Sequence, residues 1–259
     1  MDTIVAGALL ALGLFVGILT FLELGRRLGK RRLALDPEGA GTGTGAVEGA
    51  VFALVGLLIA FTFSGAASRF DARRDLIVHE TNAIGTAWLR LDLLPDTVRP
   101  TMQGLFRRYL DARIETYRRI PEMAAVTEAM NEASRLQGEI WAKAVAAGRM
   151  EGIAPDATKL LLPALNDMFD LVTTRTMAAH QHPPLAIYII LFVLSLAGAL
   201  FAGYSMAGGK SRNWLHMLGF AAVMAATVYI IIDLEFPRLG LIRVDAFDQA
   251  MADLRTSMG

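Results

Sequence analysis

The sequence predicts an all-α integral membrane protein with four transmembrane helices and a helical-bundle insert between the second and third. Its 25 basic and 25 acidic residues are segregated, because four windows carry no charge at all. These windows are Thr3–Leu22, Gly49–Ser68, Pro183–Gly209 and Asn213–Ile232. Each has the roughly 20 apolar residues that a helix needs to cross a bilayer core of about 30 Å. The long interval between the second and third windows shows helical periodicity without the alternation of strands.

The first predicted span covers residues 1–24 and is expected to be retained in the mature protein. Its start, Met1-Asp2-Thr3, lacks the positive charge of a secretory signal, and basic residues follow it in place of a cleavage site. Residues 25–45 are predicted to form a basic, glycine-rich loop. Its glycines have neither the GxGxxG spacing nor the final Gly-Lys-Ser/Thr of a phosphate-binding loop, so a flexible linker is predicted.

The second predicted span, residues 46–68, has no stop signal at its end. An apolar residue recurs every seven positions beyond the membrane, and no proline occurs between Gly45 and Leu94. One helix is therefore expected to cross the membrane and continue to Leu94, where Pro95 ends it.

The predicted extramembrane domain, residues 69–182, contains three further helical patterns. Apolar residues at 3.6-residue spacing mark each pattern. They are Met102, Leu105, Phe106, Tyr109, Leu110, Ile114 and Tyr117 in the first; Val126, Met130, Ala133, Leu136, Ile140 and Trp141 in the second; and Leu161, Leu165, Met168, Phe169 and Val172 in the third.

The remaining segments are a third span (183–207), a short loop (208–213), a fourth span (214–235) and a polar C-terminal tail (236–259). The positive-inside rule places the basic loops 25–45 and 208–213 in the cytoplasm. Both termini and the helical domain are then extracytoplasmic, in a multi-pass protein of the bacterial inner (cell) membrane. Arginines beside the second span favour the opposite orientation.

Composition excludes several classes of function. The chain has no cysteine, so thiol catalysis and cysteine-ligated metals are excluded. A net charge of zero argues against nucleic acid, which binds clustered Lys and Arg. The four histidines, His79, His180, His182 and His216, lack the spacing of a metal site. No catalytic residue, metal or cofactor is predicted, and the protein is not expected to be an enzyme.

The exit of the second span carries a pair of arginines, Arg69 and Arg73. Because they are four residues apart, they share one helical face. In an oligomer with this helix at the centre they would form a ring of positive charge, which selects anions. Two alternatives are that Asp71 and Asp75 pair with Arg74 or with neighbouring helices, and that the arginines anchor at lipid head groups.

Small residues and interfacial acids form two more sets of candidates. Gly13 and Gly17 in the first span, and Gly198 and Gly203 in the third, permit close helix packing, either within the chain or between subunits. The acids at the end of the fourth span are functional candidates by default. Asp233 and Glu235 are interpreted as partners of Arg238 in an ion pair, with an ion pathway as the alternative.

Two segments, 61–74 and 233–243, resemble a bacterial bestrophin-like membrane family, long catalogued as a domain of unknown function. That resemblance implies a distant relation to bestrophins, which are pentameric anion channels with a phenylalanine-rich neck on the second span. The corresponding neck candidates are Phe61, Phe63 and Phe70. The Arg-Thr-Asn triplet of bestrophins is absent, since Thr62-Phe-Ser64 stands at the comparable place.

These observations predict a homo-oligomeric anion channel or pore, lined by the second span, with the lipid bilayer and a small anion as partners. The alternative is a non-conducting sensor or scaffold whose helical domain binds a partner or a small ligand. The long helix that continues from the second span would then transmit movement.

Overall fold

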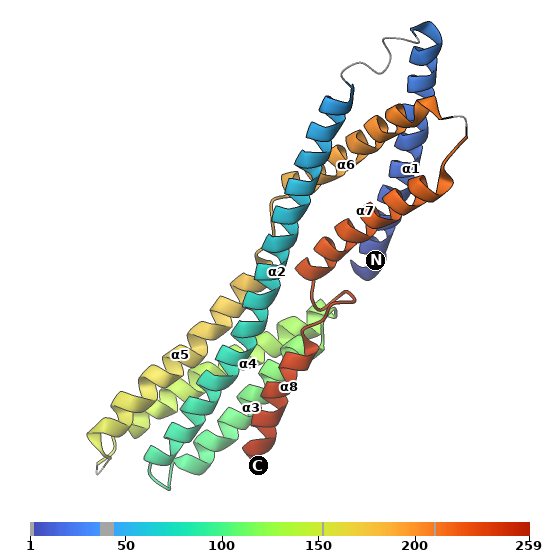
Figure 1. Cartoon of the computed structure of the whole chain (residues 1–259). Coiled ribbons are helices and arrows are strands. Elements are labelled where there is room, and N and C mark those ends of the chain that lie inside the picture. The colour runs from blue at the N-terminus through green and yellow to red at the C-terminus, as the bar shows by residue number, and fades with distance from the viewer. Residues whose placement is uncertain (1–2, 37–43, 152, 210) are drawn as a thin grey trace. The chain divides into compact units, whose positions relative to one another are not determined.

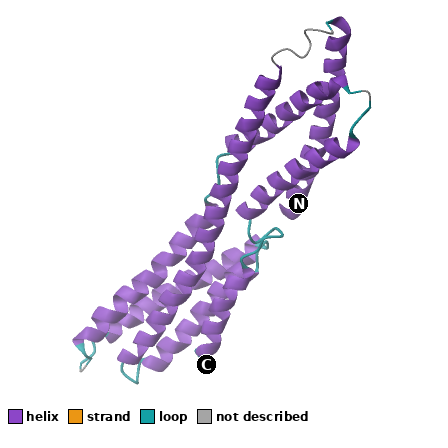
Figure 2. Ribbon diagram, in the orientation of Figure 1, coloured by secondary structure: helices purple, strands orange, loops and turns teal. Residues whose placement is uncertain are grey.

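The computed structural model describes residues 3–36, 44–151, 153–209 and 211–259, and all regular structure in these ranges is helical (Figures 1 and 2). The chain divides into two compact units. The first comprises Met1–Ser68 and His182–Leu241, and the second comprises Arg69–Gln181 and Ile242–Gly259. Four stretches contain a helix long and apolar enough to cross a membrane: Val5–Leu35, Gly45–Leu93, Asp156–Gly208 and Trp214–Glu235.

The first unit is built around α1 (Thr3–Leu35), which packs against both α6 (Leu185–Ser205) and α7 (Trp214–Glu235). A short 3₁₀ turn, η2 (Met206–Gly208), ends α6. Leu14, Ile18 and Leu22 form the buried side of α1. Burying one apolar stripe in this way leaves the other sides of the three helices to face lipid.

Helix α1 runs to Leu35, and so continues through the basic residues that the sequence analysis assigned to a loop. Arginine and lysine are good helix formers. Ion pairs one turn apart, Arg27 with Glu23 at 3.0 Å and Arg32 with Asp36 at 3.1 Å, also support the helix. The predicted glycine-rich linker that follows lies largely outside the described residues.

Helix α2 (Thr44–Arg90) is continuous over 47 residues, about 70 Å at 1.5 Å per residue. The boundary between the two units falls on it, between Ser68 and Arg69. A 3₁₀ turn, η1 (Leu91–Leu93), follows, and Leu94 adopts an extended backbone before Pro95. One long helix ending at this proline is what the sequence predicts.

The second unit packs the distal half of α2 with α3 (Arg99–Arg118), α4 (Met123–Ala147), α5 (Pro155–His180) and α8 (Asp245–Ser257). The three predicted helical patterns coincide with α3, α4 and α5. Helix α8 lies in the segment predicted only as a polar tail, and it contributes Met251 to the core. The largest fully buried core residues include Phe106, Tyr109, Ile84, Leu136 and Ile140.

Candidate functional site

Helix α2 has two distinct sides along its length. Val55, Thr62 and Ala66 share one side of α2 and are buried. On the opposite side Ser64, Ser68, Asp71 and Asp75 are exposed, and their spacing of three or four residues aligns them in one stripe. We call these four residues the polar stripe. A polar stripe at the end of a membrane-spanning helix is costly in lipid, so it suits an aqueous environment.

The neck candidates Phe61 and Phe63 point in different directions. Two residues along a helix correspond to a rotation of about 200°, so the two rings cannot both face one axis. Phe61 is 68% exposed and Phe63 is 44% exposed. Phe70 is one heptad after Phe63, and its ring centre lies 5.6 Å from the guanidinium carbon of Arg74. The structure therefore does not bring the three phenylalanines together on one side of α2.

The anion-selectivity candidates, Arg69 and Arg73, lie on the side of α2 opposite the polar stripe, and both are half-buried. Arg73 donates hydrogen bonds from Nε to the carbonyl of Ala178 at 3.1 Å and from Nη2 to the carbonyl of Gln181 at 2.9 Å. Carbonyls at a helix C-terminus lack partners within the helix, so Arg73 caps the end of α5. Asp71 and Asp75 are exposed on this part of α2, and Asp71 Oδ1 pairs with Arg74 Nη1 at 2.9 Å.

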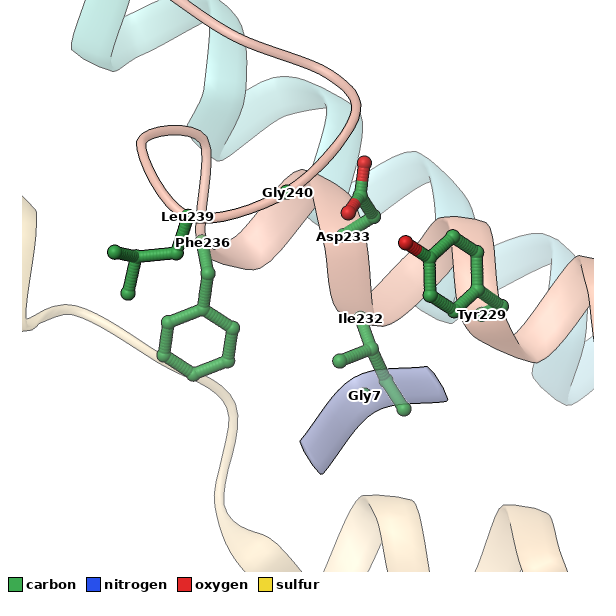
Figure 3. Close-up of a pocket in the computed structure, with 7 residues that line it drawn as sticks. All are labelled: Gly7, Tyr229, Ile232, Asp233, Phe236, Leu239 and Gly240. Atoms are coloured by element: carbon green, nitrogen blue, oxygen red, sulfur yellow. The ribbon is translucent and has the colours of Figure 1, made fainter. Parts of the chain in front are cut away.

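Both acids predicted at the end of the fourth span are buried, and Asp233 lies where α7 meets the following loop (Figure 3). Asp233 is 6% exposed, and its Oδ1 accepts a hydrogen bond from the backbone N–H of Leu241 at 3.0 Å. Its carboxylate is also hydrogen bonded to Tyr229. A cavity of about 20 Å³ beside this group is lined in part by Gly7 and Gly240, and it has room for about one water molecule.

Glu235 contacts the segment that precedes α6. Its Oε2 lies 3.4 Å from Nδ1 of His182, and the Glu235 side chain is fully buried. The His182 ring stacks on Phe236 with centroids 4.8 Å apart. Glu235 thus joins the start of the third span to the end of the fourth. Arg238 is half-buried in the loop after α7. The sequence pointed to both acids but not to His182 as a partner.

The predicted packing glycines differ in their surroundings. An added Cβ on Gly203 would lie 2.0 Å from the carbonyl oxygen of Leu22, and one on Gly17 would lie 3.1 Å from Leu196. Gly198 would place its Cβ 3.4 Å from the ring of Phe52, whereas a Cβ on Gly13 would meet nothing within 4 Å. Thus Gly17, Gly198 and Gly203 pack within the chain, and Gly13 does not.

The second unit contains a buried charge cluster, formed by Glu80, Arg113 and Arg175, that the sequence did not predict. Arg113 Nε donates to Glu80 Oε1 at 2.6 Å, and Arg175 Nη1 donates to Glu80 Oε2 at 2.5 Å. Tyr117 accepts a hydrogen bond from Arg113 at 2.9 Å, and its ring lies 3.9 Å from the guanidinium carbon of Arg175. Each of the three charged residues lies on a different helix, so no short sequence pattern indicated the cluster.

Glu80 lies on the part of α2 beyond the membrane span. Two neighbouring arginines keep its carboxyl ionised there. Burial opposes the charged form, but the charges and hydrogen bonds of Arg113 and Arg175 outweigh it, and the pKa of the Glu80 carboxyl falls below its usual value. The cluster therefore links α2, α3 and α5 by paired charges. Among the described residues, no three His, Asp or Glu side chains are arranged to hold a metal ion.

Comparisons with known proteins give one family and one fold. The sequence model of the Bestrophin-like domain matches residues 8–246. Two crystal structures of variants of a bacterial bestrophin homolog from Klebsiella pneumoniae resemble the chain with TM-scores of 0.70 and 0.69, each at 15% identity. The first alignment covers 94% of this chain and 98% of the relative, and the second covers 96% and 97%. No curated protein sequence matches the chain.

Proposed function

Because this chain belongs to the Bestrophin-like family, we propose that it assembles into an oligomeric ion pore lined by the membrane half of α2. Its family membership confirms the resemblance inferred from segments 61–74 and 233–243. The relation to bestrophins implies an ion channel, and the oligomer supplies the central axis that a single chain lacks.

The exposure of α2 carries this proposal. Only 11% of its apolar stretch is buried within the chain, against 22–28% in the other three membrane-spanning stretches. The uncovered side includes Ser64 and Ser68, whose hydroxyls suit a water-filled passage. A helix that packs little against its own chain, and carries polar groups where it leaves the membrane, fits the inner ring of an oligomer.

The charge of the permeating ion depends on which side chains reach the axis. The bestrophin relation implies anions, with Arg69 and Arg73 as the selectivity candidates. The stripe that would face the axis contains Asp71 and Asp75, which favour cations. Reversal potentials in a salt gradient distinguish these cases: Asp71→Asn reduces cation preference if the stripe lines the pore, and Arg69→Gln reduces anion preference if the arginines do.

The absence of native cysteine allows a direct test of the pore lining. Purified protein in a planar bilayer is expected to conduct, and a charged thiol reagent is expected to reduce the current of Ser64→Cys and Ser68→Cys. Leu12→Cys, at a 57% exposed position on α1, is the matched control and should be unaffected. A parent protein without current, or equal block of the control, contradicts the proposal.

A non-conducting sensor is the second candidate function, favoured by the continuity of α2 from the membrane into the second unit. The Glu80 cluster fixes the distal half of α2 to α3 and α5, so a movement of that unit would be transmitted along one rigid element. This reading predicts folded, oligomeric or monomeric protein without ion flux under any gradient.

A further inference from the structure

Helix α1 is longer than the membrane core requires, and its last third is strongly basic. Its 33 residues extend about 50 Å, whereas about 20 residues span a core of about 30 Å. The window Thr3–Leu22 carries no charge, and Glu23 is the first charged residue after it. Because a charge is costly in the core, the core ends near Glu23 and the following turns of α1 lie at the bilayer surface.

The start of α7 gives a second, independent marker of this level. Arg212, in the loop before α7, donates from Nη2 to Glu23 Oε1 at 2.9 Å. Trp214, the first residue of α7, is 54% exposed, and its ring centre lies 5.9 Å from the guanidinium carbon of Arg212. Exposed tryptophan is enriched at membrane–water interfaces. Both helices therefore meet the edge of the core at the level of Glu23.

Three exposed basic residues, Arg27, Lys30 and Arg31, follow on α1. Their spacing of three and four residues makes them project together, and we call them the basic face. Gly25 and Gly29 contact α6 and η2, and α1 continues past them (Figure 1). Each glycine is two positions from Arg27, a rotation of about 200°, so the basic face points away from the packed side of α1.

The basic face lies within reach of lipid head groups. Arg27 is four residues, about 6 Å, beyond Glu23, and Arg31 is about 12 Å beyond it. Head groups occupy about 5–8 Å on each side of the core, and long basic side chains can bend back toward them. Leu24 and Leu28, which are 44% and 43% exposed, lie beside the basic face. Leucine next to cations suits the boundary between acyl chains and head groups.

Among the described residues, the acids near the basic face already pair with arginines. Glu23 contacts two arginines, at 3.0 Å and 2.9 Å, so its single negative charge faces two positive ones. Asp36 pairs with Arg32 at 3.1 Å. Lys30 and Arg31 add two exposed positive charges. The basic face thus keeps an excess of positive charge, which is complementary to an anionic head group.

We propose that the basic face of α1 binds the head groups of anionic phospholipids. The phosphate of such a lipid lies at the depth of these side chains, and its net negative charge is absent from a zwitterionic lipid. Each basic residue near an anionic surface strengthens the attraction about fivefold. The inference goes beyond the pore of the proposed function and does not depend on it, because the basic face lies on α1 and not on α2.

Lipid competition in native mass spectrometry tests this proposal. The purified full chain is equilibrated with equal amounts of phosphatidylglycerol and phosphatidylcholine that carry the same acyl chains. The parent is expected to retain more phosphatidylglycerol. Lys30→Gln combined with Arg31→Gln should lower the ratio of bound phosphatidylglycerol to phosphatidylcholine by about 25-fold. Lys30→Arg combined with Arg31→Lys should keep the ratio, because the charges are preserved.

Arg118→Gln combined with Lys159→Gln is the matched control, because it removes two exposed charges from the second unit. It should keep the ratio of the parent, and all variants should elute and melt as the parent does.

Equal binding of the two lipids by the parent overturns the proposal, as does an unchanged ratio without Lys30 and Arg31 or an equal loss in the control. Displacement of the bound lipid by inorganic phosphate assigns the basic face to a soluble anion and overturns it too. Ion current without lipid preference contradicts the lipid site alone, whereas lipid preference without current contradicts the pore alone.

Discussion

Gly240 lies against the carboxylate of Asp233, and a Cβ added to it would be 1.8 Å from Asp233 Oδ1. That separation is far below van der Waals contact, so any side chain displaces either the loop or the carboxylate. Asp233 is buried and accepts the N–H of Leu241, so its displacement also breaks the hydrogen bond that closes the loop. Packing against Asp233 therefore requires glycine at position 240.

We therefore expect Gly240→Ala to destabilise the protein by about 1–3 kcal/mol, the usual cost of overpacking. Gly219→Ala is the matched control on α7, because a Cβ there meets nothing within 4 Å. Alanine in a helix is favoured over glycine, so the control should keep or raise the melting temperature. The measurement is thermal unfolding in detergent, and equal melting temperatures for both variants would contradict the packing argument.

Glu80 is the only carboxylate in its buried cluster, where it faces Arg113 and Arg175. Glu80→Gln leaves two buried guanidinium groups without a counter-charge, and breaking a buried pair in this way costs about 3–5 kcal/mol. Glu139→Gln removes an exposed partner of Arg135 and should cost at most about 1 kcal/mol. Comparable losses of stability in the two variants would show that the cluster does not hold the second unit together.

The pKa of Glu80 gives this contribution a defined pH dependence. Since its pKa in the folded protein lies below the unfolded value of 4.5, the stabilisation is complete above that value and is lost as pH falls further. Melting temperatures of the parent should therefore drop as the pH is lowered below 4.5. Glu80→Gln should lack this part of the drop, whereas an unchanged acid profile in the variant would assign it to other carboxylates.

Two glycines, Gly25 on α1 and Gly203 on α6, allow these two helices to approach each other closely. A Cβ on Gly25 would lie 1.9 Å from the carbonyl oxygen of Leu200, and one on Gly203 would lie 2.0 Å from that of Leu22. The backbones of α1 and α6 are thus in direct contact, which in lipid maximises dispersion between helices. Gly25 escaped the sequence analysis because it lies among basic residues assigned to a loop.

Gly25→Ala and Gly203→Ala are each expected to separate α1 from α6 and to lower the melting temperature, at a cost of about 1–3 kcal/mol. Gly13→Ala is the control on the same helix, because nothing in the chain lies within 4 Å of its Cβ. Monodispersity after extraction and the melting temperature report the effect. A stable Gly203→Ala protein would mean that the two backbones approach less closely than described.

The helices themselves follow the sequence to different degrees. Apolar periodicity predicts α3, α4 and α5, and the missing prolines between Gly45 and Leu94 predict the long α2. Helix α8 was not predicted, although Phe247, Met251 and Leu254 have helical spacing; Met251 is its only buried residue, and Phe247 and Leu254 are half-buried. An isolated helix of 13 residues is marginal in water, so α8 depends on its tertiary contacts, including the ion pair of Arg255 with Asp111 at 2.8 Å.

At the scale of the whole molecule, the distribution of basic residues predicts the orientation. The first loop and the loop with Arg212 are expected in the cytoplasm, with the helical unit outside. A reporter active only outside the cytoplasm should be active when fused after Leu94 and silent after Gly208. A reporter fused after Leu94 that is active only in the cytoplasm would contradict the predicted orientation. A second reporter of opposite specificity at each site controls for fusions that are unstable.

The four spans and the long helix follow from the sequence alone, because the cost of placing a charge in lipid and the effect of proline on a helix are local properties of the chain. Which sides of those helices are covered depends instead on tertiary packing. Arg73 caps α5, Glu80 is buried between two arginines, and Phe61 and Phe63 diverge, since each outcome depends on residues far away in the sequence or on the rotation of a helix about its axis. Charge separates membrane from water along the chain, whereas packing decides which residues remain available to an ion or to another subunit.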